Sequence, residues 1–241
     1  MPAYNAEQTL EKTFLEIPFD VVDNVIITDD CSRDNTVKVA NKLAEKSQAN
    51  VFVICHNKNK GYGGNQKSSY KKALEIGSDI VIMVHPDYQY TPKLIHSIVY
   101  AIADDIFPVM FASRILGEGA LKGGMPLIKY LSNRILTLTQ NIFLNRKLSE
   151  YHTGYRAYSA EVLRSVNYES LSDDFVFDNQ IIAQIISKGY AIGEVTCPTK
   201  YFPEASSINL KRSAVYGFGV LKVSFMYRLH KWHLCNYKIL Q

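Results

Sequence analysis

The residues best suited to chemistry lie directly after an apolar run of the chain, residues 81–84. His85, Asp87 and Gln89 follow this run at alternate positions, and the intervening Pro86 ends the strand because it cannot donate a ladder hydrogen bond. In an open α/β sheet the ligand crevice lies beyond the carboxyl ends of the strands. Imidazole, carboxylate and amide groups there are typical ligands of a divalent cation that holds phosphates. The stretch therefore predicts a metal and diphosphate site. The alternative is a polar turn that caps a helix beginning near Pro92.

Polar side chains follow two other expected strands in the same way. Asp29 and Asp30 come after a β-branched run, and Ser113 and Arg114 come after another strand. A carboxylate such as Asp30 can accept hydrogen bonds from a nucleobase edge or a ribose, and Arg114 can pair with a diphosphate through its planar fork. Each group alone could equally be a cap or a surface ion pair. Together, at successive strand ends, they predict a nucleotide-diphosphate site.

Strands and helices alternate along the chain, which predicts an α/β fold with a mainly parallel sheet covered on both faces. We expect strands at residues 21–28, 51–55, 79–84, 108–113 and 191–196. We expect helices at residues 7–15, 35–47 (with Ser32 as N-cap), 66–76, 127–144 (long and amphipathic), 160–165 and 177–188 (with Gly189 as C-cap). Residues 57–65 and 117–124 are expected to be glycine-containing loops.

The C-terminal tail differs in character from the rest of the chain. Apolar residues alternate there with the basic residues Lys222, Arg228, His230 and Lys231 over residues 213–232. This pattern fits a basic amphipathic helix on a membrane surface, and the alternative is a helix docked on its own domain. We therefore expect one catalytic domain over residues 1–212 and a tail over residues 213–241.

Composition describes an ordinary globular chain of 241 residues, with 47% hydrophobic and 21% charged residues. A net charge of +4 gives no strong case for nucleic acid and suits an anionic substrate or an anionic membrane surface. The four cysteines are scattered without a CxxC pair, so we expect buried free thiols in a reducing cytosol. Neither a signal peptide nor a membrane-spanning run is found, which predicts a cytoplasmic protein, peripheral at the membrane face.

Six stretches of the chain, taken in order, resemble the family 2 glycosyltransferases and, within that family, the dolichyl-phosphate mannose synthase group. They are residues 2–7, 29–36, 59–65, 85–89, 153–157 and 201–207. The resemblance covers almost the whole chain. It implies a GT-A (Rossmann-like) fold, a nucleotide-sugar donor of the GDP-mannose or UDP-glucose type, a divalent metal (Mg²⁺ or Mn²⁺) and inversion at the anomeric carbon.

The resemblance also implies a role for individual residues. The nucleoside would be held by Pro2, Tyr4 and Asp30, the metal by Asp87 and Gln89 with His85, the donor phosphates by Arg114 and Lys200, and the charge of the acceptor by Arg134 or Arg156. These roles agree with the chemistry, because a nucleoside diphosphate is a poor leaving group until metal and cations neutralise it.

Inverting transfer also needs a base, unless the acceptor is already an anion such as a lipid phosphate. The candidates are Asp173, Asp174 and Asp178, of which Asp178 and Asp174 are our choice. Asp173 and Asp174 could equally cap the following helix. Asp178 lies within that helix beside Phe177, which suits a buried inward carboxylate.

The chain departs from the family pattern at three places. His85 stands where the family's metal motif has its first acid. An imidazole there would favour manganese over magnesium, or it could contact a metal ligand without binding the metal itself. Ser206 stands where the lipid-phosphate synthases have a lysine, which argues against a specific dolichyl-phosphate assignment. The first strand of the family fold would precede Pro2. We therefore expect apolar strand edges to be exposed, and we expect either a mis-set start codon or a fragment.

The sequence therefore predicts an inverting, metal-dependent hexosyltransferase acting on a polyprenyl phosphate or a growing glycan. Three alternatives stay open: a transferase for a soluble or lipopolysaccharide acceptor, a catalytically impaired nucleotide-sugar-binding protein, and a sugar-phosphate nucleotidyltransferase. The last class would carry a glycine-rich basic signature near its amino terminus, and residues 2–10 have none.

Overall fold

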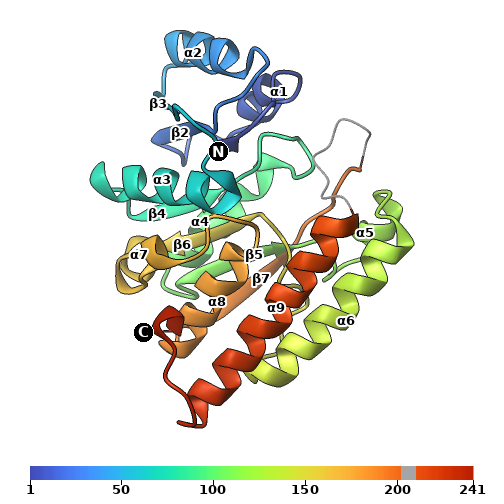
Figure 1. The fold of residues 1–241 in the computed structure, drawn as a ribbon. Coiled ribbons are helices and arrows are strands. Elements are labelled where there is room, and N and C mark those ends of the chain that lie inside the picture. Colours follow the sequence, from blue (N-terminus) through green and yellow to red (C-terminus); the bar gives the residue numbers. More distant parts are fainter. Residues whose placement is uncertain (202–209, 241) are drawn as a thin grey trace.

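The computed structural model describes residues 1–201 and 210–240 and contains two sheets (Figure 1). The first sheet is parallel, in the order β1 (Pro2–Ala3), β2 (Asn24–Asp29) and β3 (Asn50–Cys55). The second has the order β4 (Ile80–Met83), β6 (Arg156–Ser159), β5 (Val109–Ser113) and β7 (Ile192–Thr196). Strand β6 is antiparallel to β4 and β5, whereas β5 and β7 are parallel. The predicted, mainly parallel α/β architecture is confirmed.

Helices cover both faces of the strands, and each face has its own core. Along β5, Val109 and Phe111 enter one core while Met110 and Ala112 enter the other, as the alternation of side chains on a strand requires. The helices are α1 (Leu10–Leu15), α2 (Thr36–Lys46), α3 (Gly61–Glu75), α4 (Ile95–Ala103), α5 (Gly119–Lys122), α6 (Leu127–Leu144), α7 (Ala160–Ser165), α8 (Phe177–Ser187) and α9 (Leu210–Lys231). Short 3₁₀ turns occupy Pro92–Leu94, Tyr168–Ser170 and Lys238–Leu240.

The structure corrects several local predictions. Helix α3 begins at Gly61, five residues earlier than expected, and α5 lies inside the predicted loop 117–124. Ser32 is not the N-cap of α2: its Oγ accepts a hydrogen bond from the Asn5 backbone at 2.8 Å, and Asp34 accepts from the Thr36 backbone instead. Strand β6 was not predicted at all.

The thiols also differ from the prediction. All four cysteines are free, but only Cys197 is buried, whereas Cys31, Cys55 and Cys235 are exposed. The three exposed thiols lie in a loop, at the end of an edge strand and in the C-terminal segment, where little packs over them.

The amino terminus forms the short strand β1 beside β2. The Met1 amino group donates to the Ile26 carbonyl at 2.8 Å, and Pro2 lies opposite Thr28. A cavity of about 360 Å³ lies between the edges of the two sheets, with Ile26, Ile80 and Ile82 in its wall. These three side chains are partly buried, and the expected exposure of apolar strand edges stays a prediction.

Helix α9 packs against α6 and α8 and contributes Val220, Val223 and Tyr227 to the core, as the docking alternative for the tail predicts. The division of the chain at residue 212 stays a prediction. In the described part of the chain, none of the helices combines the length and the apolar character that crossing a membrane requires.

Candidate active site

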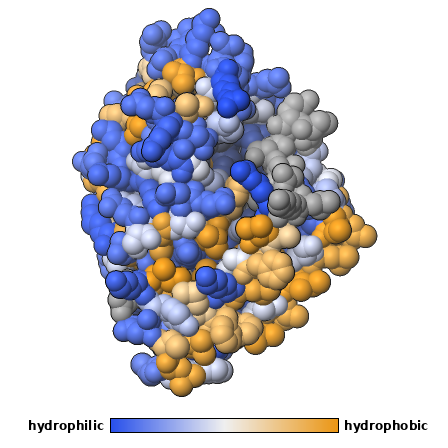
Figure 2. Space-filling view, in the orientation of Figure 1, coloured by the Kyte–Doolittle hydropathy of each residue, from blue (hydrophilic) through white to orange (hydrophobic). Residues whose placement is uncertain are grey.

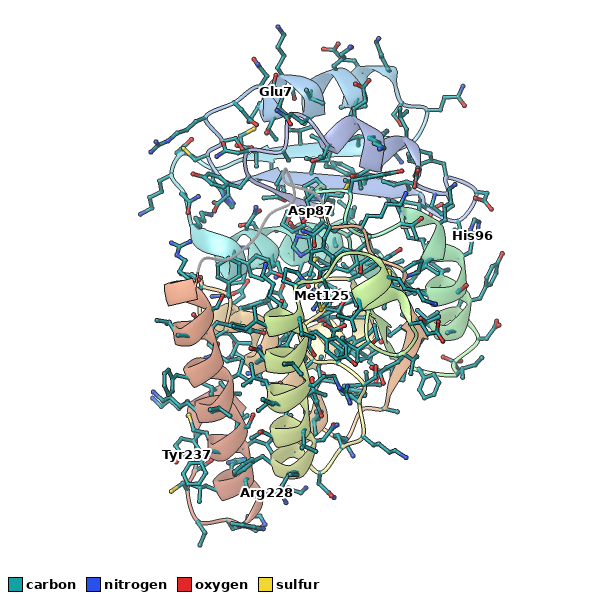
Figure 3. All side chains as sticks on the ribbon, turned by 90° about the vertical axis from the view of Figure 1, so that its right-hand side faces the viewer. Glu7, Asp87, His96, Met125, Arg228 and Tyr237 are labelled. Carbon is teal, nitrogen blue, oxygen red and sulfur yellow. The ribbon has the colours of Figure 1, made fainter. Side chains whose placement is uncertain are left out.

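The end of β4 brings the three predicted metal ligands to the middle of the molecule, where Figure 3 shows Asp87. Asp87 is half-buried, and its Oδ1 accepts a hydrogen bond from the Gln89 backbone at 3.1 Å. His85 packs against Gly154, where a Cβ atom would lie 2.3 Å from the imidazole Nε2. Only glycine therefore lets the imidazole take this position.

Tyr62, near the start of α3, contacts His85 from the other side. Its hydroxyl lies 3.2 Å from His85 Nε2, and the two rings are stacked with centroids 5.6 Å apart. The same hydroxyl donates its proton to Asp178 Oδ2 at 2.9 Å, because an ionised carboxylate can only accept. The Tyr62 oxygen must then accept from His85, which places the imidazole proton on Nε2. The lone pair of His85 is thus on Nδ1, the nitrogen left to bind a metal.

Asp178 is buried and held by three donors. Arg156 lies 3.1 Å from its Oδ1, Gln66 Nε2 donates to Oδ1 at 3.0 Å, and Tyr62 donates to Oδ2. Arg156 is fully buried, and although burial alone would lower its pKa, the charge of Asp178 holds that pKa above its usual range. Arg156 therefore keeps its charge in the folded protein.

Arg156 also binds the backbone on its other side. Its guanidinium donates to the carbonyls of Thr153 at 2.7 Å and Tyr151 at 2.9 Å. The structure thus places Arg156 inside the protein as a brace between β6 and α8, rather than on a surface that faces an acceptor.

The donor set around Asp87 fits a cation that is shared with a substrate. Across residues 1–201 and 210–240 no three His, Cys, Asp or Glu side chains gather to hold a metal. His85 and Asp87 supply an imidazole and a carboxylate, and the buried Gln89 adds an amide nearby. Magnesium-type sites commonly take only one or two carboxylates from the protein and the remaining ligands from substrate phosphates and water. The residues present fit a metal of that kind.

Asp30, at the end of β2, organises the first turn of α3. His56 Nδ1 donates to its Oδ1 at 2.8 Å, and the backbone N–H groups of Lys60 and Gly61 donate to its two oxygens at 2.8 and 2.9 Å. These bonds explain why α3 starts early. Asp30 holds the segment that carries Tyr62, so a nucleoside would meet a carboxylate that already has partners.

Pro2 and Tyr4 lie at the end of β1, next to Asp30 in the fold. Pro2 is buried and Tyr4 is half exposed. The Asp30 backbone donates to the Ala3 carbonyl at 2.9 Å, which joins the ends of β1 and β2. The structure therefore brings these three predicted nucleoside contacts together.

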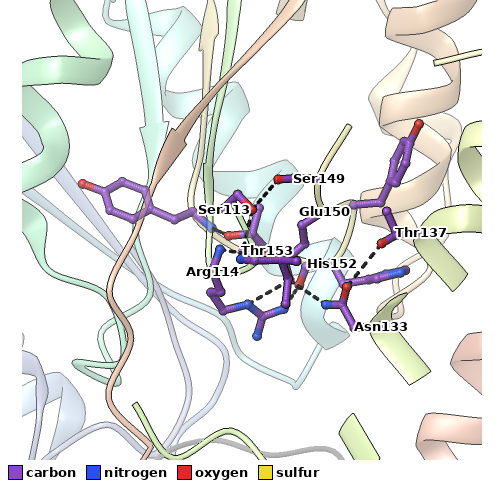
Figure 4. A network of polar contacts seen from close by, with 12 residues as sticks. Ser113, Arg114, Asn133, Thr137, Ser149, Glu150, His152 and Thr153 are labelled. Atoms are coloured by element: carbon purple, nitrogen blue, oxygen red, sulfur yellow. Dashed lines mark hydrogen bonds and ion pairs between the residues drawn. The ribbon is translucent and has the colours of Figure 1, made fainter. Parts of the chain in front are cut away.

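Arg114, at the end of β5, lies in a buried polar network (Figure 4). Its Nε donates to Glu150 Oε1 at 2.9 Å, its Nη1 to Tyr201 Oη at 2.9 Å and its Nη2 to the His152 carbonyl at 3.0 Å. Burial would raise the pKa of Glu150, but the charge of Arg114 and its hydrogen bonds together outweigh burial, and the pKa lies below its usual range. Arg114 is therefore fixed in one orientation by the chain's own acceptors.

The remaining predicted residues lie around this centre. Lys200 is exposed, with its Nζ 5.9 Å from the Tyr88 ring, and its backbone donates to the Gln89 carbonyl at 3.1 Å. Arg134 is exposed on α6 and donates to the Ser149 carbonyl at 3.0 Å. Lys200 thus lies beside the β4 end, whereas Arg134 lies on the α6 side. Ser206 lies outside the described residues.

The two other candidate bases are exposed and already bonded. Asp173 pairs with Lys67 at 2.7 Å, and its backbone carbonyl accepts from Gly63. Asp174 Oδ1 accepts from the Phe175 backbone at 2.8 Å, but the N-cap of α8 is Val176 without a side-chain cap bond, so the capping alternative is wrong for Asp174. Neither carboxylate forms a hydrogen bond or an ion pair with His85.

Sequence reasoning missed several side chains of these networks, among them Tyr62, Gln66, His56 and Glu150. Tyr62 and Gln66 are four residues apart and so share one helical face. This spacing would have been informative if residues 61–65 had been assigned to the helix. His56 and Glu150 have no local signal, because their partners are 26 and 36 residues away.

Comparisons with known proteins give a consistent result. Residues 1–166 match the profile described as glycosyl transferase family 2. The chain is 32% identical over 221 residues to the UDP-N-acetylglucosamine–dolichyl-phosphate N-acetylglucosaminyltransferase of Methanococcus voltae, covering 83% of this chain and 84% of that protein. It is 24% identical to the undecaprenyl-phosphate mannosyltransferase of Micrococcus luteus, covering 71% of this chain and 69% of that protein.

The fold resembles that of glucosyl-3-phosphoglycerate synthase from Mycobacterium tuberculosis in complex with Mn²⁺, UDP-glucose and phosphoglyceric acid. The TM-score is 0.66 at 17% identity, and the match covers 98% of this chain and 79% of that chain. At this level of identity the likeness shows a shared fold.

Proposed function

The chain belongs to glycosyltransferase family 2 and has a GT-A-like fold, and from this premise we propose that it is an inverting hexosyltransferase acting on a polyprenyl phosphate. The donor would be a nucleoside-diphosphate sugar of the UDP- or GDP-linked type. Two relatives named for dolichyl phosphate and undecaprenyl phosphate support this class of acceptor. The predicted location at the cytoplasmic membrane face stays a prediction.

The observation that carries the proposal is the state of the candidate bases. Asp178 is held by Arg156, Tyr62 and Gln66, while Asp173 and Asp174 are bonded to other groups. A hydroxyl acceptor needs a base to take its proton, whereas a phosphate monoester is already an anion. Because all three of these candidate bases already have partners, the site suits a lipid phosphate better than a sugar hydroxyl.

The proposed reaction is a direct displacement. A phosphate oxygen of the acceptor attacks the anomeric carbon of the sugar, and the bond from that carbon to the donor diphosphate breaks with inversion. Asp87 Oδ2 and His85 Nδ1 would hold a divalent metal, which when bound neutralises the departing diphosphate. Tyr62 keeps the His85 proton on Nε2, and Lys200 adds a positive charge beside the β4 end.

A donor and acceptor panel tests this proposal. Purified protein is incubated with UDP- and GDP-sugars and Mn²⁺, and release of nucleoside diphosphate is measured with undecaprenyl phosphate or with undecaprenol. We expect turnover with the phosphate and none with the alcohol, which differs only in lacking the anion. Turnover with the alcohol or with a glycan would refute the anionic-acceptor argument and favour a hydroxyl acceptor.

A second candidate is a nucleotide-sugar-binding protein without transferase activity. His85 favours it, because it stands where the family's metal motif has its first acid and an imidazole adds no negative charge to the metal site. Metal-dependent donor binding without turnover for any acceptor would support this reading. Release of pyrophosphate from a nucleoside triphosphate would instead indicate a nucleotidyltransferase.

A further inference from the structure

Helix α6 is amphipathic, but its apolar side faces outward. Its buried residues include Asn133, Thr137 and Gln140. Six of its apolar residues are half to two-thirds exposed, and Ile128 and Ile135 are each 66% exposed. An ordinary surface helix shows the opposite arrangement, with apolar residues toward the core. The exposed stripe therefore needs an apolar environment that this domain does not supply.

Helix α9 extends the same apolar surface. Phe225 of α9 packs edge-to-face on Phe143 of α6 at 6.1 Å, and Gly217 approaches Leu136, so the two helices run side by side in the same direction. Figure 2 shows apolar side chains gathered over both helices. We call this surface the α6–α9 face; its exposed apolar residues are Leu127, Ile128, Leu131, Ile135, Leu138, Ile142, Val215, Phe218, Leu221 and Phe225.

The charges on these two helices are of one sign. Helix α6 contains Lys129 and Arg134, and α9 contains five further Lys and Arg residues, but neither helix contains an Asp or Glu. Pairing this face with a second copy of the chain would bring like charges together without a partner. An anionic surface with an apolar interior would match both properties of the face.

We propose that the α6–α9 face lies on a lipid bilayer that contains anionic lipids, with both helices in the plane of the interface. Apolar side chains would enter the boundary between headgroups and acyl chains, and lysines and arginines would meet lipid phosphates. Helix α6, which the tail pattern of the sequence does not include, supplies half of the surface. The contact is therefore a broad two-helix face and not a single anchoring tail.

The two helices that carry the face also contact the candidate active site. Tyr216 of α9 bonds His152 at 2.8 Å and accepts from Asn179 at 2.8 Å. Asn133 of α6 donates to Glu150, the partner of Arg114, at 2.7 Å. The inward sides of α6 and α9 thus contact the networks of the site, while their outward sides form the face, which is defined without reference to the sugar or the acceptor.

Vesicle sedimentation tests the proposal. Full-length protein is mixed with vesicles of phosphatidylcholine plus phosphatidylglycerol, or of phosphatidylcholine alone, without donor or acceptor. We expect binding to the anionic vesicles that weakens with salt, and weak binding to the neutral ones. The double variant Ile135→Gln/Leu138→Gln should lower the partition coefficient at least about tenfold. Lys129→Glu/Lys222→Glu should lower binding to anionic vesicles by about tenfold.

Matched variants away from the face provide the controls. Leu15 and Ile106 are also exposed, at 69% and 62%, so Leu15→Gln/Ile106→Gln should bind like wild type. Lys42→Glu/Lys46→Glu on α2 makes the same charge change away from the α6–α9 face and should also bind like wild type. Thermal unfolding of each variant in solution should match wild type, and the separate pair Ile128→Gln/Leu131→Gln should repeat the loss.

Two results would overturn the proposal. One is wild-type protein that stays in the supernatant with anionic vesicles. The other is a dimer in sedimentation velocity that Ile135→Gln/Leu138→Gln dissociates while vesicle binding is unchanged, which would assign the face to a second copy. The vesicle experiment contains no donor or acceptor, so neither result bears on the proposed transfer reaction. In the same way, a failure of the transfer assay would not bear on vesicle binding.

Discussion

Replacing Asp178 by asparagine should destabilise the fold. Asp178 is 7% exposed and Arg156 is fully buried, with 3.1 Å between Asp178 Oδ1 and the guanidinium. Removing one partner of a buried ion pair costs about 3–5 kcal/mol, because the other charge stays buried without compensation. Asparagine keeps the size and one acceptor oxygen, so we expect the lower limit, about 3 kcal/mol.

For a chain of this length, a loss of about 3 kcal/mol should lower the thermal midpoint by roughly 6–12 °C. Thermal unfolding followed by circular dichroism measures the midpoint, and urea unfolding measures the free energy. The control is Asp174→Asn, on an exposed carboxylate of the same region, which should change stability by no more than about 0.5 kcal/mol.

The double variant Arg156→Met/Asp178→Asn tests the pairing itself. If the two side chains stabilise each other, the loss in the double variant should be smaller than the sum of the single losses, by roughly 0.5–3 kcal/mol. An Asp178→Asn protein with the wild-type midpoint but without transfer activity would refute our reasoning. That result would mean that Asp178 serves the reaction and not the fold.

Three further outcomes are expected. Asp87→Ala should abolish Mn²⁺-dependent donor binding in calorimetry while the exposed Asp104→Ala does not, and unchanged affinity would remove Asp87 from the site. Tyr62→Phe should weaken Mn²⁺ affinity by about 10–100-fold and give a mixture of His85 tautomers in ¹⁵N spectra; a single Nε2–H tautomer would contradict the hydrogen-bond argument. Burial lowers the pKa of His152 from 6.5 to about 4, so the unfolded chain binds more protons between these values. Stability should therefore be full above pH 6.5 and fall toward pH 4, by up to about 1.4 kcal/mol per unit, and His152→Gln should reduce that slope in urea unfolding.

The strand ends of the site were predictable because their signals are local. An apolar run that stops at Pro86 marks the end of β4 without any knowledge of its neighbours. The same holds for helix α6, whose predicted bounds at residues 127–144 are confirmed, since a helical period of apolar residues needs no tertiary information.

Strand β6 could not be found this way. Its residues, Arg156 to Ser159, begin with a charge and show no apolar alternation. They form a strand because β4 and β5 both pair with them, and Arg156 can be buried there only because Asp178 lies opposite. Both conditions depend on residues far away in the chain.

The early start of α3 has a similar cause. Residues 61–65 contain three glycines and resemble a loop, since glycine is unfavourable inside a helix. The Asp30 carboxylate and the Asp173 carbonyl accept the first N–H groups of this segment, and a Cβ on Gly63 would lie 2.4 Å from the Ser172 carbonyl. Tertiary acceptors and close packing thus outweigh the local preference, and they place Tyr62 beside His85.

The orientation of α6 connects the site to the α6–α9 face. An amphipathic pattern fixes which residues share a side but not which side is buried. Asn133 donates to Glu150 at 2.7 Å and Gln140 donates to Asn179 at 2.8 Å, so the polar stripe of α6 supplies partners to the buried networks around Arg114 and α8. Turning the helix round would leave those groups without partners, at a penalty of about 1–3 kcal/mol each. The inward polar stripe therefore forces the apolar stripe outward, and the arrangement that builds the site is the one that gives the protein a face suited to a membrane.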